Sequence, residues 1–209
     1  MKVFNRSIAL FALASLSFSA CSNTFNWRQE VPLQDGRVLV IERESDQGPY
    51  DSFVAMKMEV GQTLTFVHPD TGERIRWKLP DGLQPHMLGF DQSIPYYVLK
   101  AYTVSDYNKW NCPNPPDMVF RYAEKHWAQI PFEQLPAQFV KPNLISMAKS
   151  NERYISSGYA STEGLAAYQE RVAKQFRTIS REKISPIAKG CEESVLIKQG
   201  RQSEIDTRR

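Results

Sequence analysis

Apolar and charged side chains alternate strictly in one short stretch of the chain. Ile75, Trp77 and Leu79 are separated by Arg76 and Lys78, and this period of two places the apolar set on one face of a strand and the charged set on the other. One face must therefore be covered while the other stays in water. The pattern indicates an antiparallel sheet that is solvated on one side.

Alternation of this kind continues through most of the first half of the chain. Asp35-Gly36, between Val31–Leu33 and Val38–Ile41, suits a two-residue type I′ hairpin because both central positions need positive φ. Further strands are predicted at residues 56–60, 64–66, 74–79, 96–104, 118–122 and 127–132, with a break at Gly61-Gln62 and turns at Asp70-Thr71-Gly72 and Glu124-Lys125. Because Pro131 cannot donate to a ladder, the last strand is expected at a sheet edge.

Beyond residue 143 the apolar spacing changes to three and four. The stripe consists of Leu165, Tyr168, Val172, Phe176 and Ile179. It predicts an amphipathic helix that is capped by Ser161 or Thr162 and stopped by Pro186, and a weaker helical turn is expected at residues 144–150. The predicted fold class is therefore α+β: an antiparallel sheet, forming a small sandwich or a partly closed barrel, with one main C-terminal amphipathic helix.

The first residues have a composition of their own. Lys2 and Arg6 precede an almost uncharged run from Ser7 to Phe18. Its twelve residues are fewer than the roughly 20 that a membrane-spanning helix needs. A positive start followed by a short apolar run is typical of a cleaved secretory signal.

The end of this run, Phe18-Ser19-Ala20-Cys21, resembles the lipobox of bacterial lipoproteins. The resemblance implies that residues 1–20 are removed and that Cys21 carries a diacylglycerol and an acylated amine. With Ser22 rather than Asp after the cysteine, it also implies the bacterial outer membrane, bound by lipid and not crossed. The alternative is ordinary secretory cleavage, for instance after Ser19.

These signals divide the chain into four parts. Residues 21–26 would form the lipidated N-terminus and a short tether, and residues 27–191 a single α+β domain, β-rich over 27–135 and helical over 143–185. Residues 192–209 have few large apolar side chains and are expected to form a flexible tail.

The chain has three cysteines, Cys21, Cys112 and Cys191. If Cys21 carries lipid, the other two form an even pair in an oxidising compartment, where a disulfide between Cys112 and Cys191 is expected. The alternative is a reactive thiol or a metal ligand. The neighbours of Cys112 are loop residues without a histidine, which favours the disulfide.

The charge balance argues against nucleic acid as a partner. The formal net charge is +3, and removal of Lys2 and Arg6 with the signal leaves 24 basic and 23 acidic residues. Basic residues gather at 74–78 and again at Arg171, Lys174, Arg177, Arg181 and Lys183. Either set could rest on an anionic lipid or glycan surface, or could simply be the solvated face of an amphipathic element.

Motifs for catalysis, metal binding or cofactor binding are missing from the sequence. The three histidines, His68, His86 and His126, are 18 and 40 residues apart, so no two share a ligand spacing. His68 could be a base oriented by Asp70, or part of a polar turn, and the turn is the favoured interpretation. We expect no catalytic residues, no metal and no cofactor.

Aromatic residues are concentrated between Tyr96 and Phe132, where nine of them lie. Most are expected to fill the core. Tyr107 and Trp110 are expected in a surface loop, where an exposed aromatic side chain can contact a partner.

The sequence therefore favours a cell-envelope lipoprotein that binds a protein or glycan partner without catalysis. An envelope hydrolase, with a site built from His68 and Asp70 or from His126 and a distant carboxylate, is the second hypothesis. A structural component of an envelope assembly is the third, and the oligomeric state stays open.

Overall fold

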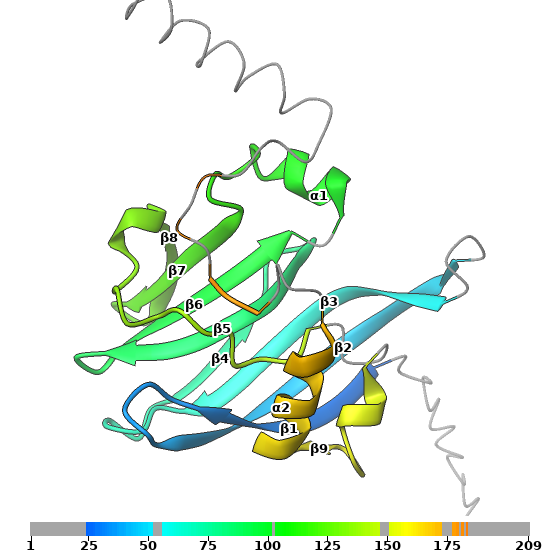
Figure 1. The fold of residues 1–209 in the computed structure, drawn as a ribbon, viewed down its shortest axis with the longest axis horizontal. Helices are drawn as coiled ribbons and strands as arrows, with labels where there is room; N and C mark the ends of the chain where they lie inside the picture. Colours follow the sequence, from blue (N-terminus) through cyan, green and yellow to red (C-terminus); the bar gives the residue numbers. More distant parts are fainter. Residues whose placement is uncertain are drawn as a thin grey trace, which may run out of the picture.

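The computed structural model describes residues 24–51, 56–101, 103–146, 151–172, 177–179, 181 and 183. These residues form two sheets. In Figure 1 the first is coloured blue to teal, with the short β9 in yellow, and the second is green. The first has the strand order β4-β3-β2-β1-β9 and comprises β1 (Thr24–Pro32), β2 (Val38–Asp51), β3 (Met56–Val67), β4 (Arg74–Lys78) and β9 (Tyr159–Ala160). The second has the order β5-β6-β7-β8 and comprises β5 (Leu83–Asp91), β6 (Ile94–Ala101), β7 (Asp117–Ala123) and β8 (His126–Ile130).

Neighbouring strands are antiparallel with one exception, the short parallel pair of β1 and β9. The predicted antiparallel sheet is therefore confirmed. Within the described residues the strands make two separate sheets and no closed barrel, so the partly closed barrel is not what forms.

The two sheets share one hydrophobic core. Its buried members come from both sheets: Val31, Leu33, Ile41, Leu64, Phe66, Ile75, Leu79, Leu83, Leu88, Tyr97, Leu99, Met118, Phe120 and Leu144. Trp77 of β4 stacks on Trp127 of β8 with 4.7 Å between ring centroids. The alternation around Trp77 thus does what its period predicts, because the apolar face meets the other sheet while Arg74 and Arg76 lie in water.

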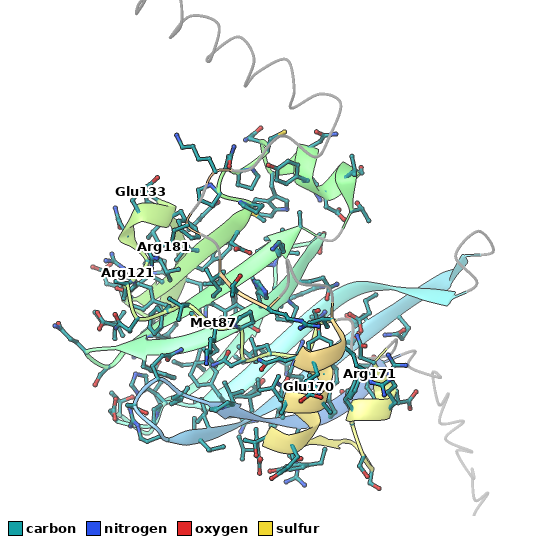
Figure 2. The ribbon with its side chains drawn as sticks, in the orientation of Figure 1. Met87, Arg121, Glu133, Glu170, Arg171 and Arg181 are labelled. Atoms are coloured by element: carbon teal, nitrogen blue, oxygen red, sulfur yellow. The ribbon has the colours of Figure 1, made fainter. Side chains whose placement is uncertain are left out.

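Besides a small cluster around Tyr107, two further clusters of the described residues lie outside this core. One contains Trp27 and α2 (Thr162–Arg171), together with the 3₁₀ turn η2 (Glu152–Tyr154). The other covers the outer face of the second sheet, where Phe139 and Ile179 pack on Met87. The 3₁₀ turn η1 (Phe132–Gln134) borders this second cluster. Next to this cluster, Arg181 donates to the carbonyl oxygens of Leu135 and Pro136. Figure 2 shows Arg181 beside Glu133.

The C-terminal helix is shorter than its apolar stripe predicts. Ser161 caps it as expected, since its Oγ accepts from the amide of Gly164, but the helix ends at Arg171. Ile179 lies outside the helix and belongs to the cluster on the second sheet. The expected turn at 144–150 is not helical at residues 144–146, and residues 147–150 lie outside the described residues.

Several strand boundaries also differ from the prediction. The break at Gly61-Gln62 is wrong, because β3 runs through both residues. The register between β2 and β3 does shift next to this point, on either side of Gln47, where Asp46 faces Gly61 but Gln47 faces Glu59. The first hairpin has a longer loop than predicted. The amide of Leu33 donates to the carbonyl oxygen of Arg37. Gly36 has positive φ, at 86°, but Asp35 does not, so the turn is not of type I′. By contrast Glu124 and Lys125 both have positive φ, and β8 is an edge strand, as predicted.

Candidate binding site

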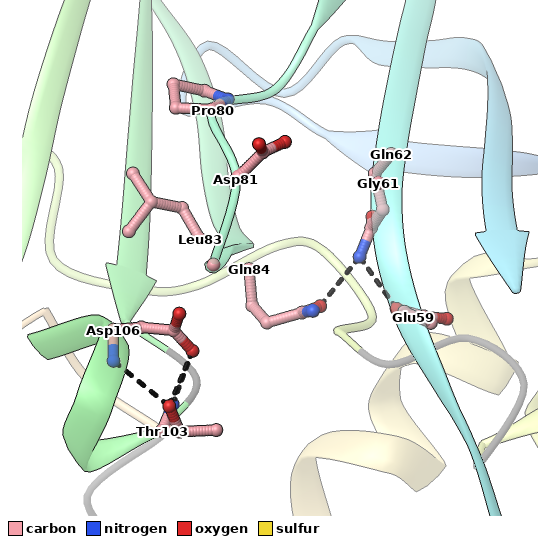
Figure 3. A pocket seen from close by; sticks show the side chains of 10 residues that line it. Glu59, Gly61, Gln62, Pro80, Asp81, Leu83, Gln84, Thr103 and Asp106 are labelled. Atoms are coloured by element: carbon pink, nitrogen blue, oxygen red, sulfur yellow. Dashed lines mark hydrogen bonds between the residues drawn. The ribbon is translucent and has the colours of Figure 1, made fainter. Parts of the chain in front are cut away.

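A small pocket of about 250 Å³ opens between β3, the start of β5 and the six-residue helix α1 (Val104–Lys109). Figure 3 shows its lining, which consists of Glu59, Gly61, Gln62, Pro80, Asp81, Gly82, Leu83, Gln84, Thr103 and Asp106. Five of these side chains end in a carboxylate or an amide. Several hydrogen-bonding groups therefore meet at the pocket beside its glycine, proline and leucine walls, and its charged groups are acidic.

The amide of Gln62 forms the inner wall of this pocket. Its Nε2 donates to Oε2 of Glu59 at 2.8 Å and to Oε1 of Gln84 at 2.6 Å, while its Oε1 accepts from Nη2 of Arg43 at 2.7 Å. A guanidinium can only donate. Arg43 therefore fixes which way the Gln62 amide points, and the oxygens of Glu59 and Gln84 are held by the Nε2 group.

Arg43 lies behind the pocket and is 2% exposed. It also donates to Oε1 of Gln29 and to the carbonyl of Ile145, and its guanidinium lies 4.5 Å from the ring centroid of Trp27. Burial lowers the pKa of Arg43, although an arginine stays protonated in proteins. Among the described residues no carboxylate forms an ion pair with it. The buried charge is instead satisfied by amide oxygens and an aromatic face, an arrangement that tolerates little displacement.

The outer wall is held by a capping box at the start of α1. The amide of Asp106 donates to Oγ1 of Thr103 at 3.0 Å, and the amide of Thr103 donates to Oδ2 of Asp106 at 3.1 Å. Gly82 passes directly beneath, with φ of 78°, and an added Cβ would lie 2.2 Å from Oδ1 of Asp106. Only glycine fits at position 82, so this strand start and the first turn of α1 are packed closely together.

Tyr107 and Trp110 are not the exposed loop residues that the sequence suggested. Tyr107 lies in α1 and is 2% exposed, and its hydroxyl donates to the carbonyl of Pro113 at 2.8 Å. Burial raises the pKa of Tyr107. Trp110 follows the helix, is partly buried and packs against the main core. Sequence spacing misses this because a helix of six residues is too short to show a period.

Trp110 nevertheless lies beside the pocket. Its Nε1 donates to the carbonyl of Asp81 at 3.3 Å, and Asp81 is one of the lining residues. Of the two aromatic residues predicted to bind a partner, the structure therefore connects Trp110 to a hollow surface and leaves Tyr107 in a structural role. Whether either contacts a partner stays a prediction.

Cys112 is disulfide-bonded. The other cysteines of the chain, Cys21 and Cys191, lie outside the described residues. The pairing of Cys112 with Cys191 and the lipidation of Cys21 therefore both stay predictions.

His68 is part of a turn, as the favoured interpretation had it. Its Nε2 lies 2.8 Å from the carbonyl oxygen of Ser93, and its Nδ1 accepts from the backbone amides of Asp70 and Thr71. The carboxylate of Asp70 instead accepts from Arg37 and Ser93, and those contacts lower the pKa of Asp70. Asp70 therefore does not orient the imidazole, and a His68–Asp70 catalytic pair is not formed.

His126 is exposed and lies 3.2 Å from the carbonyl oxygen of Glu124. The histidine that does meet a carboxylate is His86, which the sequence did not single out for a site. Its Nδ1 is 3.2 Å from Oδ1 of Asp117, and Nζ of Lys100 is 3.6 Å from the same oxygen. His86 and Asp117 are 5% and 2% exposed. The cluster joins β5, β6 and β7 across the sheet, and Asp117 also lines a small hollow of about 190 Å³ beside Pro113 and Pro131.

A larger hollow of about 460 Å³ lies beside α2. Its lining consists of Pro32, Leu33, Gln34, Gln138, Val140, Lys141, Pro142, Asn143, Thr162, Leu165, Ala166 and Gln169. Lys141 is the one charged residue among them. Because its walls are mainly aliphatic, prolyl and amide groups, it lacks the converging charged groups of the smaller pocket.

The described parts of the chain contain no cluster of three or more His, Cys, Asp or Glu residues placed to hold a metal ion. Within the same parts, every helix is too short or too polar to cross a bilayer. Comparison with protein-family models, with curated proteins and with solved structures found no match to this chain.

Proposed function

We propose that this chain is a bacterial cell-envelope lipoprotein, a small β-sandwich with one C-terminal helix, that binds an envelope glycan without catalysis. Its anchor is the lipid on Cys21, and its binding site is the pocket between β3, β5 and α1. The observation that carries the proposal is the convergence of Glu59, Gln84 and Asp81 on one small hollow.

The chemistry of this hollow matches sugar hydroxyl groups. Carboxylate and amide oxygens accept hydrogen bonds, and amide nitrogens donate them, so such walls can bind several hydroxyls at once. Trp110 lies beside the pocket, where its Nε1 donates to the carbonyl oxygen of the lining residue Asp81. Glu59, Asp81 and Asp106 disfavour phosphate and other anions by like-charge repulsion.

The volume also sets the size of the ligand group. Small-molecule sites usually measure about 300–1,000 Å³, and this pocket measures about 250 Å³. It therefore receives a single sugar unit of a longer chain, with the rest of the glycan lying outside.

The hydrolase hypothesis is less favoured. In the form built on histidine, it needs an imidazole within reach of substrate. The His86–Asp117 pair is buried, and the pocket with the carboxylates of Glu59, Asp81 and Asp106 has no histidine in its lining. His68 is engaged in its turn by Ser93 and by two backbone amides.

Binding to envelope glycans tests the proposal. Purified lipidated protein in detergent would be mixed with isolated peptidoglycan and sedimented. Gln84→Leu removes one hydrogen-bonding group from the pocket, and Asp81→Asn replaces one accepting oxygen by an NH2 group that cannot accept. Each should lower the bound fraction about tenfold, the loss expected for one good hydrogen bond. Gln138→Leu in the larger hollow is the matched control and should bind like the wild type.

Circular dichroism and thermal melting would show that the variants are folded. Retained binding in folded Gln84→Leu and Asp81→Asn would exclude this pocket as the glycan site. If the wild type instead binds envelope proteins and the same variants lose that binding, the pocket is the binding site but the partner is a protein.

A further inference from the structure

The first strand begins very close to the proposed lipid. β1 starts at Thr24, three residues after Cys21. Because consecutive Cα atoms are about 3.8 Å apart, the two Cα atoms are separated by at most about 11 Å, whatever the path between them. The expected tether of residues 21–26 is thereby shortened, since residues 24–26 pair with β2.

The end of the molecule at Thr24 carries partly exposed hydrophobic side chains. Phe25, Tyr154 and Val172 all pack at the margin of the cluster around Trp27. Phe25 stacks on Trp27 with 5.3 Å between ring centroids. Figure 1 shows the start of β1, the yellow segment with η2 and the helix α2 lying together there.

Arginines surround these side chains. Arg153 lies 4.9 Å from the ring centroid of Tyr154. Arg171 lies in the last turn of α2, as Figure 2 shows, and Arg177 donates to the carbonyl oxygens of Val172 and Glu170. All three arginines are exposed. Aromatic and basic side chains side by side are typical of surfaces that meet lipid headgroups.

We propose that this end of the domain, formed by Phe25, Tyr154, Val172, Arg153 and Arg171, rests on the headgroups of the leaflet that holds the lipid. The inference depends on the proposed lipidation of Cys21, which is what brings a bilayer within reach. The short link is the main argument, because a domain attached this closely cannot turn another face to the same membrane.

Two glutamates reduce the positive charge of this surface and so its preference for anionic lipid. Glu152 and Glu170 lie among the arginines, so the surface is only weakly basic and the arginines add a modest preference for anionic headgroups. The pocket wall α1 lies at the opposite end of the view from α2 in Figure 1. The opposite wall of the pocket lies closer to the membrane end, because Thr24 pairs with Asp46 and Asp46 with Gly61 across the first sheet.

Tryptophan quenching by spin-labelled lipid tests this orientation. The lipidated protein would be reconstituted on vesicles of phosphatidylethanolamine and phosphatidylglycerol that carry a headgroup nitroxide. Trp27 is buried directly beneath the proposed contact, where it stacks on Phe25, and Trp110 lies beside the pocket. The quenched part of the emission should disappear in Trp27→Phe and persist in Trp110→Phe.

A second pair of variants covers the case in which Trp27→Phe does not fold. Tyr154→Trp places a probe on the proposed surface and should increase the quenched fraction, whereas Tyr122→Trp in the second sheet should not. Vesicle flotation separates the two proposals. Protein that does not float contradicts the lipid anchor. The orientation alone is contradicted if the protein floats but its emission is not quenched. It is also contradicted if the quenched emission comes from Trp110, or if Tyr122→Trp increases the quenched fraction.

Discussion

At the scale of single residues, Asn143 does more than its type suggests. It is 4% exposed and its side-chain amide joins the two sheets. Oδ1 accepts from the amide of Leu88 at 2.9 Å, and Nδ2 donates to the carbonyls of Leu88 at 2.7 Å and Pro32 at 3.0 Å. The amide thus takes the place of a neighbouring strand along the edge of β5.

Asn143→Ala should lower the free energy of unfolding by about 3 kcal/mol, because it leaves three backbone groups unsatisfied at about 1–3 kcal/mol for each that stays buried. Denaturant titration of the purified protein measures this. Gln138→Ala is the control, since the exposed bond from Gln138 to Asp91 should contribute under about 0.5 kcal/mol. A loss of under about 1 kcal/mol for Asn143→Ala would mean that water replaces the amide.

Such roles cannot be predicted from residue type. Alternation puts Arg43 on the same strand face as Ile41, but its residue type does not predict that its charge lies buried, 2% exposed, behind the pocket. Its partners Gln29, Gln62 and Ile145 are 14, 19 and 102 positions away. Local patterns carry no information on contacts of that separation.

At the scale of elements, Glu30 connects three of them. From β1, its Oε1 accepts from the hydroxyl of Tyr159 in β9 at 2.7 Å, and its Oε2 accepts from the amide of Thr162 at the start of α2 at 2.8 Å. These two bonds hold the pKa of Glu30 below its ordinary value of 4.5. The short strand and the helix are thereby positioned by one ionised carboxylate.

This bond pattern predicts a pH dependence. A carboxylate whose pKa is lower in the folded state contributes its stability above the unfolded pKa and loses it as the pH falls through the folded pKa. The thermal midpoint of the wild type should therefore fall as the pH is lowered from about 5 to about 3. Glu30→Gln should lose part of that slope.

Tyr159→Phe removes the larger cause of the lowered pKa and should show a smaller loss of slope than Glu30→Gln. Melting curves at a series of pH values measure all three proteins. Identical slopes in the three would show that Glu30 does not couple these elements to pH.

Elements were predictable where their pattern was long and regular. The strands around Trp77 and the hairpin at Glu124-Lys125 follow from alternation and turn chemistry. β5 was missed because it contains Pro85, His86 and Gly89 and is buried on both faces over most of its length, so it shows neither strand composition nor alternation. Pro85 is tolerated because β5 is an edge strand with a bulge at that point. The candidate pocket joins the start of β5 and the short helix α1 to the Gly61-Gln62 step of β3, which the sequence suggested as a break, so its chemistry was not visible in the sequence.

At the scale of the whole molecule, the anchor and the disulfide can be tested together. The mass of the intact protein extracted from membranes should correspond to a chain that begins at Cys21 and carries diacylglycerol and an acyl group. Reduction should add two hydrogen atoms if Cys112 and Cys191 are paired.

Cys21→Ser provides the control and should block both processing and acylation. A mass that includes Met1, or one without acyl chains, would contradict the lipid anchor. A mass unchanged by reduction would contradict the disulfide.

The first sheet also determines how neighbouring copies meet when they are crowded in one membrane. β4 is an edge of that sheet and carries Arg74, Arg76 and exposed Lys78 along its solvated face. If two copies joined through β4, the cations of one copy would lie beside those of the other. Glu42 and Glu44 could not pair with the second copy's arginines, because they already pair with Arg74 and Arg76 of their own chain. Repulsion of this kind disfavours continuous sheets between molecules. The arginines of β4 thus disfavour edge-to-edge association of copies that a lipid anchor would hold in one membrane plane.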